Sequence, residues 1–394
     1  MLSKLLLPQV VEFIKEQEKS TLKPTDFDRL LFNKSKYPHI PMELVVDQLR
    51  ARQKAKIKLP QWFNTEGVIF PPLLSMEQCS SELAAKYKSS LVQGGLAIDL
   101  TGGAGVDTYY LSKKFQRVIY VDFNKDLAEI AAHNFKILGV ENIEVFNGKS
   151  EDFISQFSNK VDLIYIDPAR RDQHKKLFLL EDCSPNILSL QVVLLQKATK
   201  VIVKASPMLD IAKGIVQLQN VSEVQVVGIK NEVKELLFIQ EQKVFEHIAI
   251  TSIDLGLHYK FTANYISNVE VPLSSISSFL YEPNATILKS GKSDELATKF
   301  NLSKLNRNTN LYTSLQLNKK FLGRKFLVEK VLKYDKREVR LHLASNQANI
   351  AIRNFPDTAE VVRKRLGLKQ GGTTYLFGVR DNKNFPKIVI CSKI

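Results

Sequence analysis

A glycine-rich turn after an apolar segment constrains the fold of this chain more than any other feature. Residues 97–100 read Ala-Ile-Asp-Leu, the turn contains Gly102, Gly103 and Gly105, and residues 107–115 have the apolar spacing of a helix. Glycines at such a turn let the backbone approach a ligand with no side chain in between. The segment therefore predicts a strand, a phosphate-sized turn and a helix, as at the start of a nucleotide-cofactor fold.

Two aspartates end later predicted strands at distances that fit the same fold. Asp122 follows the predicted strand 117–121 and lies seventeen positions after Gly105. A carboxylate there can accept hydrogen bonds from both hydroxyls of a ribose. Asp167 follows the predicted strand 161–166 and is itself followed by a proline. This ordered set is much harder to obtain by chance than the glycine turn alone.

Strands and helices alternate from residue 97 to about residue 242, which predicts an α/β fold with a parallel sheet covered on both faces. Seven strands are expected, at residues 97–100, 117–121, 143–147, 161–166, 200–204, 223–229 and 235–240. The connection between the last two is too short for a crossover helix, so they must run antiparallel. A nicotinamide dehydrogenase fits less well, because the turn lacks the third glycine of the dinucleotide fingerprint.

The length of 394 residues allows several domains, and we expect four. They are a helical domain at residues 1–74, the α/β domain at 75–272, a small mixed module at 273–322 and a basic α+β module at 323–394. The α/β domain should open with one helix, 76–93, which begins at a capping box formed by Ser75 and Gln78. In the last module, residues 339–343 have the pattern of a strand.

Basic residues are concentrated at the C-terminal end. The chain has a formal net charge of +15, and the segment from Lys319 to Ile394 holds 18 Lys or Arg against 6 Asp or Glu. Solubility alone does not require charge of one sign, because a mixed-sign surface would keep the module soluble equally well. We therefore favour a polyanionic partner, RNA, as the reason for the positive charge. A second basic cluster, from Arg50 to Lys58, precedes Trp62 and fits RNA binding and a solvated helix end equally.

Composition excludes several classes of protein. No apolar run approaches the ~20 residues of a membrane-spanning helix, and Pro8 interrupts the opening apolar segment before a signal-peptide core could form. The cysteines, Cys79, Cys183 and Cys391, lack the spacing of a metal site or a disulfide framework. We therefore expect a cytoplasmic protein with no membrane partner and no metal.

The motifs together resemble a known family. The order of glycine turn, Asp122 and Asp167 resembles the class I methyltransferases that use S-adenosylmethionine, and residues 167–171, Asp-Pro-Ala-Arg-Arg, resemble the Asp-Pro-Pro motif of those that methylate a base or amide nitrogen. With Glu77–Glu82, Tyr281–Ala285 and Gly371–Tyr375 added, nearly the whole chain resembles bacterial RNA methyltransferases that have a ferredoxin-like module and a C-terminal THUMP-like domain. The resemblance implies a Rossmann-like sheet of seven strands and methylation of structured RNA, an rRNA or a tRNA.

The resemblance also implies roles for individual residues. S-adenosylmethionine would be bound by the glycine turn, by later strand ends and by the helix before the first strand, namely by Asp99, Thr101, Gly102, Gly103, Gly105, Asp122, Ser150 and Gln78. Asp167, the Pro168 carbonyl and Arg170 would bind the acceptor base, the first two by accepting hydrogen bonds from its amino group. Lys149 stands where many members of the wider superfamily have an acid.

Other interpretations of these residues stay open. Gln78 can be a helix cap, and Arg170 can belong to a structural ion pair. Cys183 could serve as the nucleophile of a carbon methylation, although no base is paired with it in the sequence. The substrate could instead be a protein side-chain amide, and a non-catalytic RNA-binding protein could keep the same fold.

Overall fold

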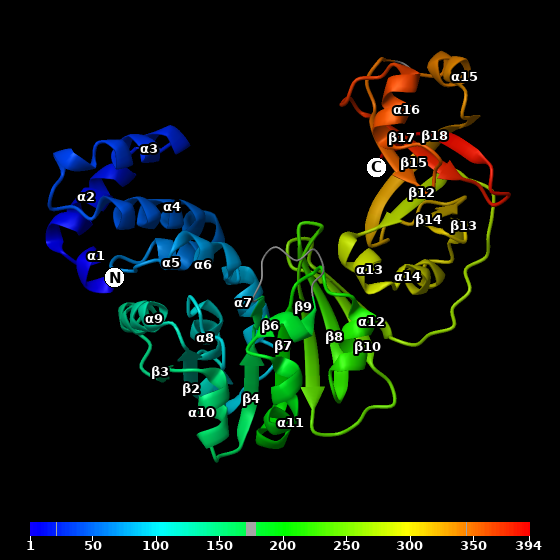
Figure 1. The fold of residues 1–394 in the computed structure, drawn as a ribbon. Helices are drawn as coiled ribbons and strands as arrows, with labels where there is room; N and C mark the ends of the chain where they lie inside the picture. The colour runs from blue at the N-terminus through cyan, green and yellow to red at the C-terminus, as the bar shows by residue number, and fades with distance from the viewer. Residues whose placement is uncertain (21, 171–178, 344) are drawn as a thin grey trace. The chain divides into compact units, whose positions relative to one another are not determined.

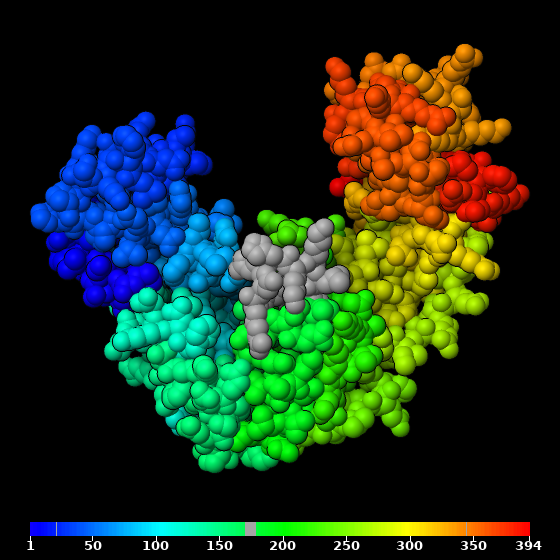
Figure 2. All heavy atoms as spheres, in the orientation of Figure 1, coloured from blue at the N-terminus to red at the C-terminus, as the bar shows by residue number. Residues whose placement is uncertain are grey.

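The structure is a computed structural model, and it describes residues 1–20, 22–170, 179–343 and 345–394. The chain divides into two compact units (Figures 1 and 2). We call them the N-terminal unit, Met1–Ser222 with Leu236–Phe245, and the C-terminal unit, Glu223–Glu235 with Glu246–Ile394. Among the described residues, no helix is long and apolar enough to cross a membrane.

Short helices open the N-terminal unit, before the first strand of the main sheet. They are α1 (Leu2–Leu5), α2 (Pro8–Glu18), α3 (Pro24–Phe32), η1 (Lys34–Lys36), α4 (Met42–Lys58), α5 (Pro60–Phe63), α6 (Leu73–Gln78) and α7 (Glu82–Ser89). Proline opens α2, α3 and α5, where its fixed φ suits the first helical turn. Leu49 of α4 packs in one core cluster with Ile130, and Trp62 packs against Tyr109. These helices therefore share hydrophobic cores with the helices that follow.

The single helix expected at 76–93 is wrong. Pro72 is the N-cap residue of α6, so Ser75 lies inside that helix and forms no capping box with Gln78. The helix ends at Gln78, and Ser81 starts α7 by accepting a hydrogen bond from a backbone amide of its first turn. The prolines before Ser75, which suit a helix start, explain the earlier beginning.

The main sheet is built around parallel strands. In the described residues it has nine strands, in the order β11-β10-β8-β9-β7-β4-β1-β2-β3. Their bounds are β1 (Gly94–Asp99), β2 (Phe115–Asp122), β3 (Ile143–Asn147), β4 (Val161–Ile166), β7 (Ala198–Ala205), β8 (Val221–Ile229), β9 (Glu232–Glu241), β10 (Ala249–Asp254) and β11 (Tyr259–Asn264). β9 runs antiparallel to β7, which confirms the reversed final strand.

The expected number of seven strands is too low for this sheet. β10 adds in parallel to β8, and β11 adds antiparallel to β10. The reason lies in β8, whose side chains at Val224 and Val226 have no exposed surface. A strand this apolar is unsuited to an open edge, because an exposed edge would invite pairing with other chains.

Helices connect the parallel strands: α8 (Val106–Leu111), α9 (Lys125–Ile137), α10 (Ser150–Gln156), η2 (Leu180–Asp182), α11 (Ile187–Lys197) and α12 (Ile211–Gln217). Asn124, Asn186 and Asp210 cap α9, α11 and α12 through their side-chain oxygens. A short hairpin of β5 (Ala169–Arg170) and β6 (Cys183–Ser184) lies outside the main sheet. α8, α9, α10 and α12 each begin within seven residues of the strand before them, so their first turns lie close to the carboxyl ends of β1, β2, β3 and β7.

The C-terminal unit contains a second sheet. Within the described part of the chain it has seven strands, in the order β13-β14-β12-β15-β18-β17-β16. Its elements are β12 (Phe279–Pro283), α13 (Ala285–Ser290), α14 (Ser293–Lys299), β13 (Ser303–Asn306), β14 (Thr309–Ser314), β15 (Gly323–Lys333), α15 (Lys336–Leu341), β16 (Asn349–Arg353), α16 (Ala359–Leu366), β17 (Thr374–Arg380) and β18 (Pro386–Lys393). Pairing of β12 with β15 joins residues before and after position 322 in one sheet.

The strand expected at 339–343 is wrong. The Asp335 carboxylate accepts hydrogen bonds from the amides of Arg337 and Glu338 and so starts the helix α15 there. The side chain of Val339 is buried on the inner face of this helix. A cap that satisfies free amides thus outweighs the β-propensity of the short apolar run.

A buried carboxylate connects distant strands of the second sheet. The Glu282 side chain on β12 is 5% exposed and forms ion pairs with Arg324 of β15 and Arg353 of β16. β16 is the edge strand, separated from β12 by β15, β18 and β17 in the order of the sheet. The sheet must therefore curl to bring Arg353 to Glu282. Phe326 and Phe377 belong to the core cluster that includes residues of both ends of the curl.

Neutralising Glu282 should destabilise the C-terminal unit. Glu282→Gln leaves two guanidinium groups without their buried counter-charge, and breaking a buried ion pair typically costs about 3 to 5 kcal/mol. Because both arginines are partly exposed, we expect a loss of about 2 kcal/mol or more in urea unfolding of the full chain. Glu329→Gln, at an exposed site on β15, is the control and should change the free energy by less than about 0.5 kcal/mol. Equal stability of the two variants would contradict the role of Glu282.

Candidate functional site

The glycines of the turn are required for different reasons. A Cβ on Gly102 would lie 2.1 Å from the ring of Tyr120, and a Cβ on Gly105 would lie 2.8 Å from the ring of Phe135. Gly103 has a φ of +53°, and a Cβ there would have no atom nearer than 3.7 Å. Packing therefore fixes Gly102 and Gly105, whereas Gly103 borders open space that a ligand can enter.

Asp99 holds the turn together from the end of β1. Its carboxylate accepts hydrogen bonds from the amide of Thr101 at 3.1 Å and from the hydroxyl of Thr108 at 2.6 Å. Burial raises the pKa of this carboxyl to about 7, against the opposing effect of the Thr108 hydroxyl. With 1% of its surface exposed, Asp99 shapes the turn and offers a ligand almost no surface of its own.

Hydrogen bonds tie the turn to both neighbouring strand ends. Asp122 accepts hydrogen bonds from the amides of Gly103 and Asn124, each at 2.8 Å. Burial raises the pKa of Asp122, although these amides act in the opposite direction. On the other side, the amide of Asp167 donates to the hydroxyl of Thr101 at 2.6 Å. Since β1 pairs in parallel with both β2 and β4, the three strand ends lie side by side.

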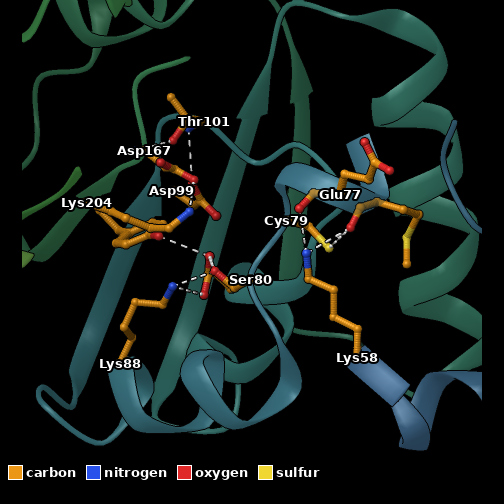
Figure 3. Close-up of polar contacts among 12 residues, drawn as sticks. Lys58, Glu77, Cys79, Ser80, Lys88, Asp99, Thr101, Asp167 and Lys204 are labelled. Carbon is orange, nitrogen blue, oxygen red and sulfur yellow. Dashed lines mark hydrogen bonds and ion pairs between the residues drawn. The ribbon is translucent and has the colours of Figure 1, made fainter. Parts of the chain in front are cut away.

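Asp167 presents a partly exposed carboxylate at this edge. Its side chain is 33% exposed and forms an ion pair with Lys204, whose side chain is 12% exposed. Lys204 comes from β7, which pairs in parallel with β4 so that Ile166 lies opposite Val203. Figure 3 shows Lys204 reaching toward Asp167 beside Thr101. Sequence reasoning missed Lys204, because only the pairing of β7 with β4 brings it here.

The remaining predicted residues contribute less to this centre. Ser150 is buried, and its hydroxyl donates to the carbonyl that follows β1 at 2.5 Å. Gln78 is exposed at the end of α6. The backbone of Arg170 pairs with Cys183 in the β5–β6 hairpin, but its side chain and Arg171 lie outside the described residues. The Cys183 side chain has no exposed surface, which disfavours its interpretation as a nucleophile.

A buried polar cluster beside the strand of Asp167 was also missed. Lys88 Nζ lies 3.0 Å from the carboxylate of Asp107, and the two side chains are 3% and 12% exposed. The hydroxyls of Ser80 and Tyr165 donate to the same carboxylate at 2.6 and 3.0 Å (Figure 3). Although burial opposes it, Lys88 and Lys204 hold the pKa of Asp107 below its usual range. A lysine near a helix end looks exposed in a sequence, so only the structure could reveal this pair.

The N-terminal basic cluster, Arg50–Lys58, is largely engaged within its own unit. Arg52 forms an ion pair with Glu18. Lys58 donates hydrogen bonds to two backbone carbonyls near the end of α6, at 2.9 and 2.8 Å. Trp62, which follows the cluster, is completely buried. These contacts favour a structural role for the cluster over RNA binding.

The raised pKa of Asp99 should make stability depend on pH. Its folded-state pKa of about 7 exceeds the unfolded value of about 3.9, so the free energy of unfolding falls as the pH rises between them. Asp99→Asn removes this titration. Relative to that variant, the wild type should lose roughly 1 to 2 kcal/mol of unfolding free energy between about pH 5.5 and about pH 8. Urea unfolding of both proteins measures it, and a difference that does not change with pH would argue against the raised pKa.

Known proteins match both the domains and the whole chain. Family models match for RNA cap guanine-N2 methyltransferase at residues 94–172, for a ferredoxin-like domain at 279–321 and for a THUMP-like domain at 323–393. A solved structure from Porphyromonas gingivalis W83, to which methyltransferase activity is ascribed, is 28% identical with a TM-score of 0.80. The match covers 95% of this chain and 100% of that chain. Among curated proteins, none matches the chain.

Two smaller solved structures align with part of the chain. An rRNA methylase from Streptococcus thermophilus is 15% identical with a TM-score of 0.31 and covers 41% of this chain and 95% of its own. A Streptococcus mutans protein in complex with SAH is 14% identical with a TM-score of 0.32, and covers 41% and 96%. Likeness at this level carries no weight for activity. The three domain matches and the full-length match confirm the resemblance inferred from the motifs: the chain combines a methyltransferase domain with a ferredoxin-like and a THUMP-like domain.

Proposed function

We propose that this protein is an S-adenosylmethionine-dependent methyltransferase that transfers the methyl group to a base nitrogen of structured RNA, an rRNA or a tRNA. One observation carries the proposal. The open space at Gly103, the carboxylate of Asp122 and the partly exposed carboxylate of Asp167 stand at the adjacent carboxyl ends of β1, β2 and β4. Ligands of open parallel sheets bind at this edge.

The residues present fit the nucleoside part of the cofactor. A carboxylate has about four lone-pair sites, and Asp122 uses two of them for backbone amides, which leaves two for ribose hydroxyls. The next residue, Phe123, is 76% exposed, and Phe146 at the end of β3 is 40% exposed. Either ring offers an apolar face on which an adenine can lie. When bound, the cofactor supplies a methyl group already activated by its sulfonium sulfur.

Asp167 and Pro168 would orient the acceptor. The hydroxyl of Thr101 holds the backbone amide of Asp167, and Lys204 pairs with one of its carboxylate oxygens. The other carboxylate oxygen and the Pro168 carbonyl can then accept hydrogen bonds from an amino group. These two bonds direct the nitrogen lone pair toward the methyl carbon, and alignment of this kind lowers the barrier without a strong base.

The C-terminal unit offers the charge that an RNA partner needs. Lys364 and Lys369 are exposed there and, in the described ranges, form no ion pair, whereas Arg324 and Arg353 are committed to Glu282. The matched family models, one for an RNA cap methyltransferase and one THUMP-like, support the same partner. Lysine–phosphate contacts would position the RNA and leave base selection to the methyltransferase site. A protein amide substrate would explain these cations less well.

Asp122→Ala should weaken the binding of S-adenosylhomocysteine about tenfold or more. The variant removes a charged hydrogen-bond acceptor worth about 1.5 to 3 kcal/mol. Calorimetric titration of the full chain measures the dissociation constant. The control, Asp126→Ala, removes a carboxylate that is 55% exposed and should leave binding unchanged. Wild-type affinity in a folded Asp122→Ala variant would contradict the proposal that Asp122 binds the cofactor.

Binding of structured RNA should fall steeply with salt, and the exposed lysines of the C-terminal unit should set part of the slope. Each phosphate contact adds about 0.7 to 0.9 to the slope of log affinity against log salt. Changing both Lys364 and Lys369 to Gln in the full chain should therefore lower the slope by about 1 to 2. The control changes Lys19 and Lys36, exposed in the N-terminal unit. Filter binding of a tRNA transcript over a salt series measures both, and equal slopes would count against this surface.

A further inference from the structure

The ion pair between Lys204 and Asp167 is the least expected contact of the site. Only 12% of the lysine side chain is exposed, although lysine on a strand end commonly extends into water. A solvated pair of this kind would contribute little and leave both side chains free to move. A largely desolvated ammonium is instead fixed by its partner, so it also fixes the carboxylate that it meets. The close-up in Figure 3 shows both groups at the strand ends.

Structural needs alone do not account for this pair. The backbone of Asp167 is already held by the hydroxyl of Thr101, and β4 and β7 pair through their backbones. The nearby Lys88 has its own counter-charge in Asp107, so Asp167 is not needed to balance it. What Lys204 does determine is the orientation and the charge of the carboxylate that the proposed acceptor would meet.

The other charged groups near the Lys204–Asp167 pair do not change the net charge of the pair. Asp99 is buried behind the turn, and its raised pKa keeps much of it protonated near neutral pH. Lys88 forms an ion pair with Asp107, whose carboxylate Lys204 also stabilises. Lys58, the last residue of α4, donates to backbone carbonyls near the end of α6. The net charge that a ligand meets at the end of β4 therefore depends on whether Lys204 is present.

We propose that Lys204 is a positioning residue for methyl transfer that holds one oxygen of Asp167, leaves the other for the acceptor and cancels the carboxylate charge near the sulfonium of the donor. The inference rests on the proposed function. Without Lys204, the Asp167 carboxylate would attract the positively charged donor in the ground state, which tightens binding without accelerating transfer. With Lys204, the cationic donor and its neutral product meet an uncharged pair.

The test compares two ligands that differ by one methyl group and one positive charge. Calorimetry on the full chain gives the dissociation constants of S-adenosylmethionine and S-adenosylhomocysteine, and we define selectivity as the constant of the second divided by that of the first. Lys204→Met should raise selectivity about threefold or more, because the carboxylate charge is uncompensated. Asp167→Asn should lower it about threefold or more, because the ammonium is uncompensated. The double variant and Lys204→Arg should both return close to the wild-type value.

Lys200→Met is the matched control. Lys200 lies on the same strand and pairs with Glu241 at 3.6 Å, so its loss should leave selectivity unchanged. A purely structural role of Lys204 would weaken both ligands equally, which would overturn the inference while the proposed function stands. If Lys204→Met does not fold, Asp167→Asn and Lys204→Arg decide the matter, and selectivity unchanged in the first or altered in the second would overturn it. Wild-type protein that binds neither ligand would instead contradict the proposed function itself.

Discussion

Parallel pairing of β1 with β2 on one side and with β4 on the other is the constraint on which the site depends. Asp99 lies opposite Tyr120 in one pair and opposite Tyr165 in the other. Asp122 at the end of β2 and Asp167 directly after β4 each stand two residues further along the chain, so they reach the same level on either side of the glycine turn. Two hydrogen bonds fix both residues to the turn. The amide of Gly103 donates to the Asp122 carboxylate, and the amide of Asp167 donates to the Thr101 hydroxyl.

Features with a local cause could be predicted from the sequence. β3 and β4 occupy the residues expected for them, and the turn at Gly103 stands where the glycine pattern indicates. The reason is that strand ends and positive φ angles can be inferred from the local sequence, through its apolar pattern and its glycines. No local sequence pattern of this kind indicates that Lys204 belongs to the site. Its contact with Asp167 depends on β7 lying next to β4 and on burial of a side chain type that is mostly exposed.

The errors have two physical causes: some concern a helix cap that was misjudged, and the others concern a strand whose partner is distant in the sequence. Local caps decide where α6 and α7 divide and make a helix of residues 336–341. A distant strand partner explains the strand count, because β10 extends the main sheet beyond the seven strands expected. The boundary predicted at residue 322 stays a prediction, and β12 pairs with β15 across it. A boundary drawn from composition at that residue says nothing about whether the two parts fold separately, since removing β15 would open the edge of β12.

An RNA would meet less positive charge on the C-terminal unit than the number of its Lys and Arg residues implies. Arg324 and Arg353 neutralise a buried glutamate, and Arg340 donates to two backbone carbonyls at the C-terminal end of α16. Cations engaged in such contacts stabilise the fold, so they contribute little to RNA binding through counterion release. The positive charge that an RNA would meet therefore belongs to the exposed cations that form no ion pair in the described residues, such as Lys364, Lys369 and Arg337, because Arg324 and Arg353 serve the stability of the second sheet. Arginine suits the contact with Glu282, because the rigid guanidinium of Arg324 donates two hydrogen bonds to this buried carboxylate, whereas an exposed lysine offers a mobile point charge that suits phosphates.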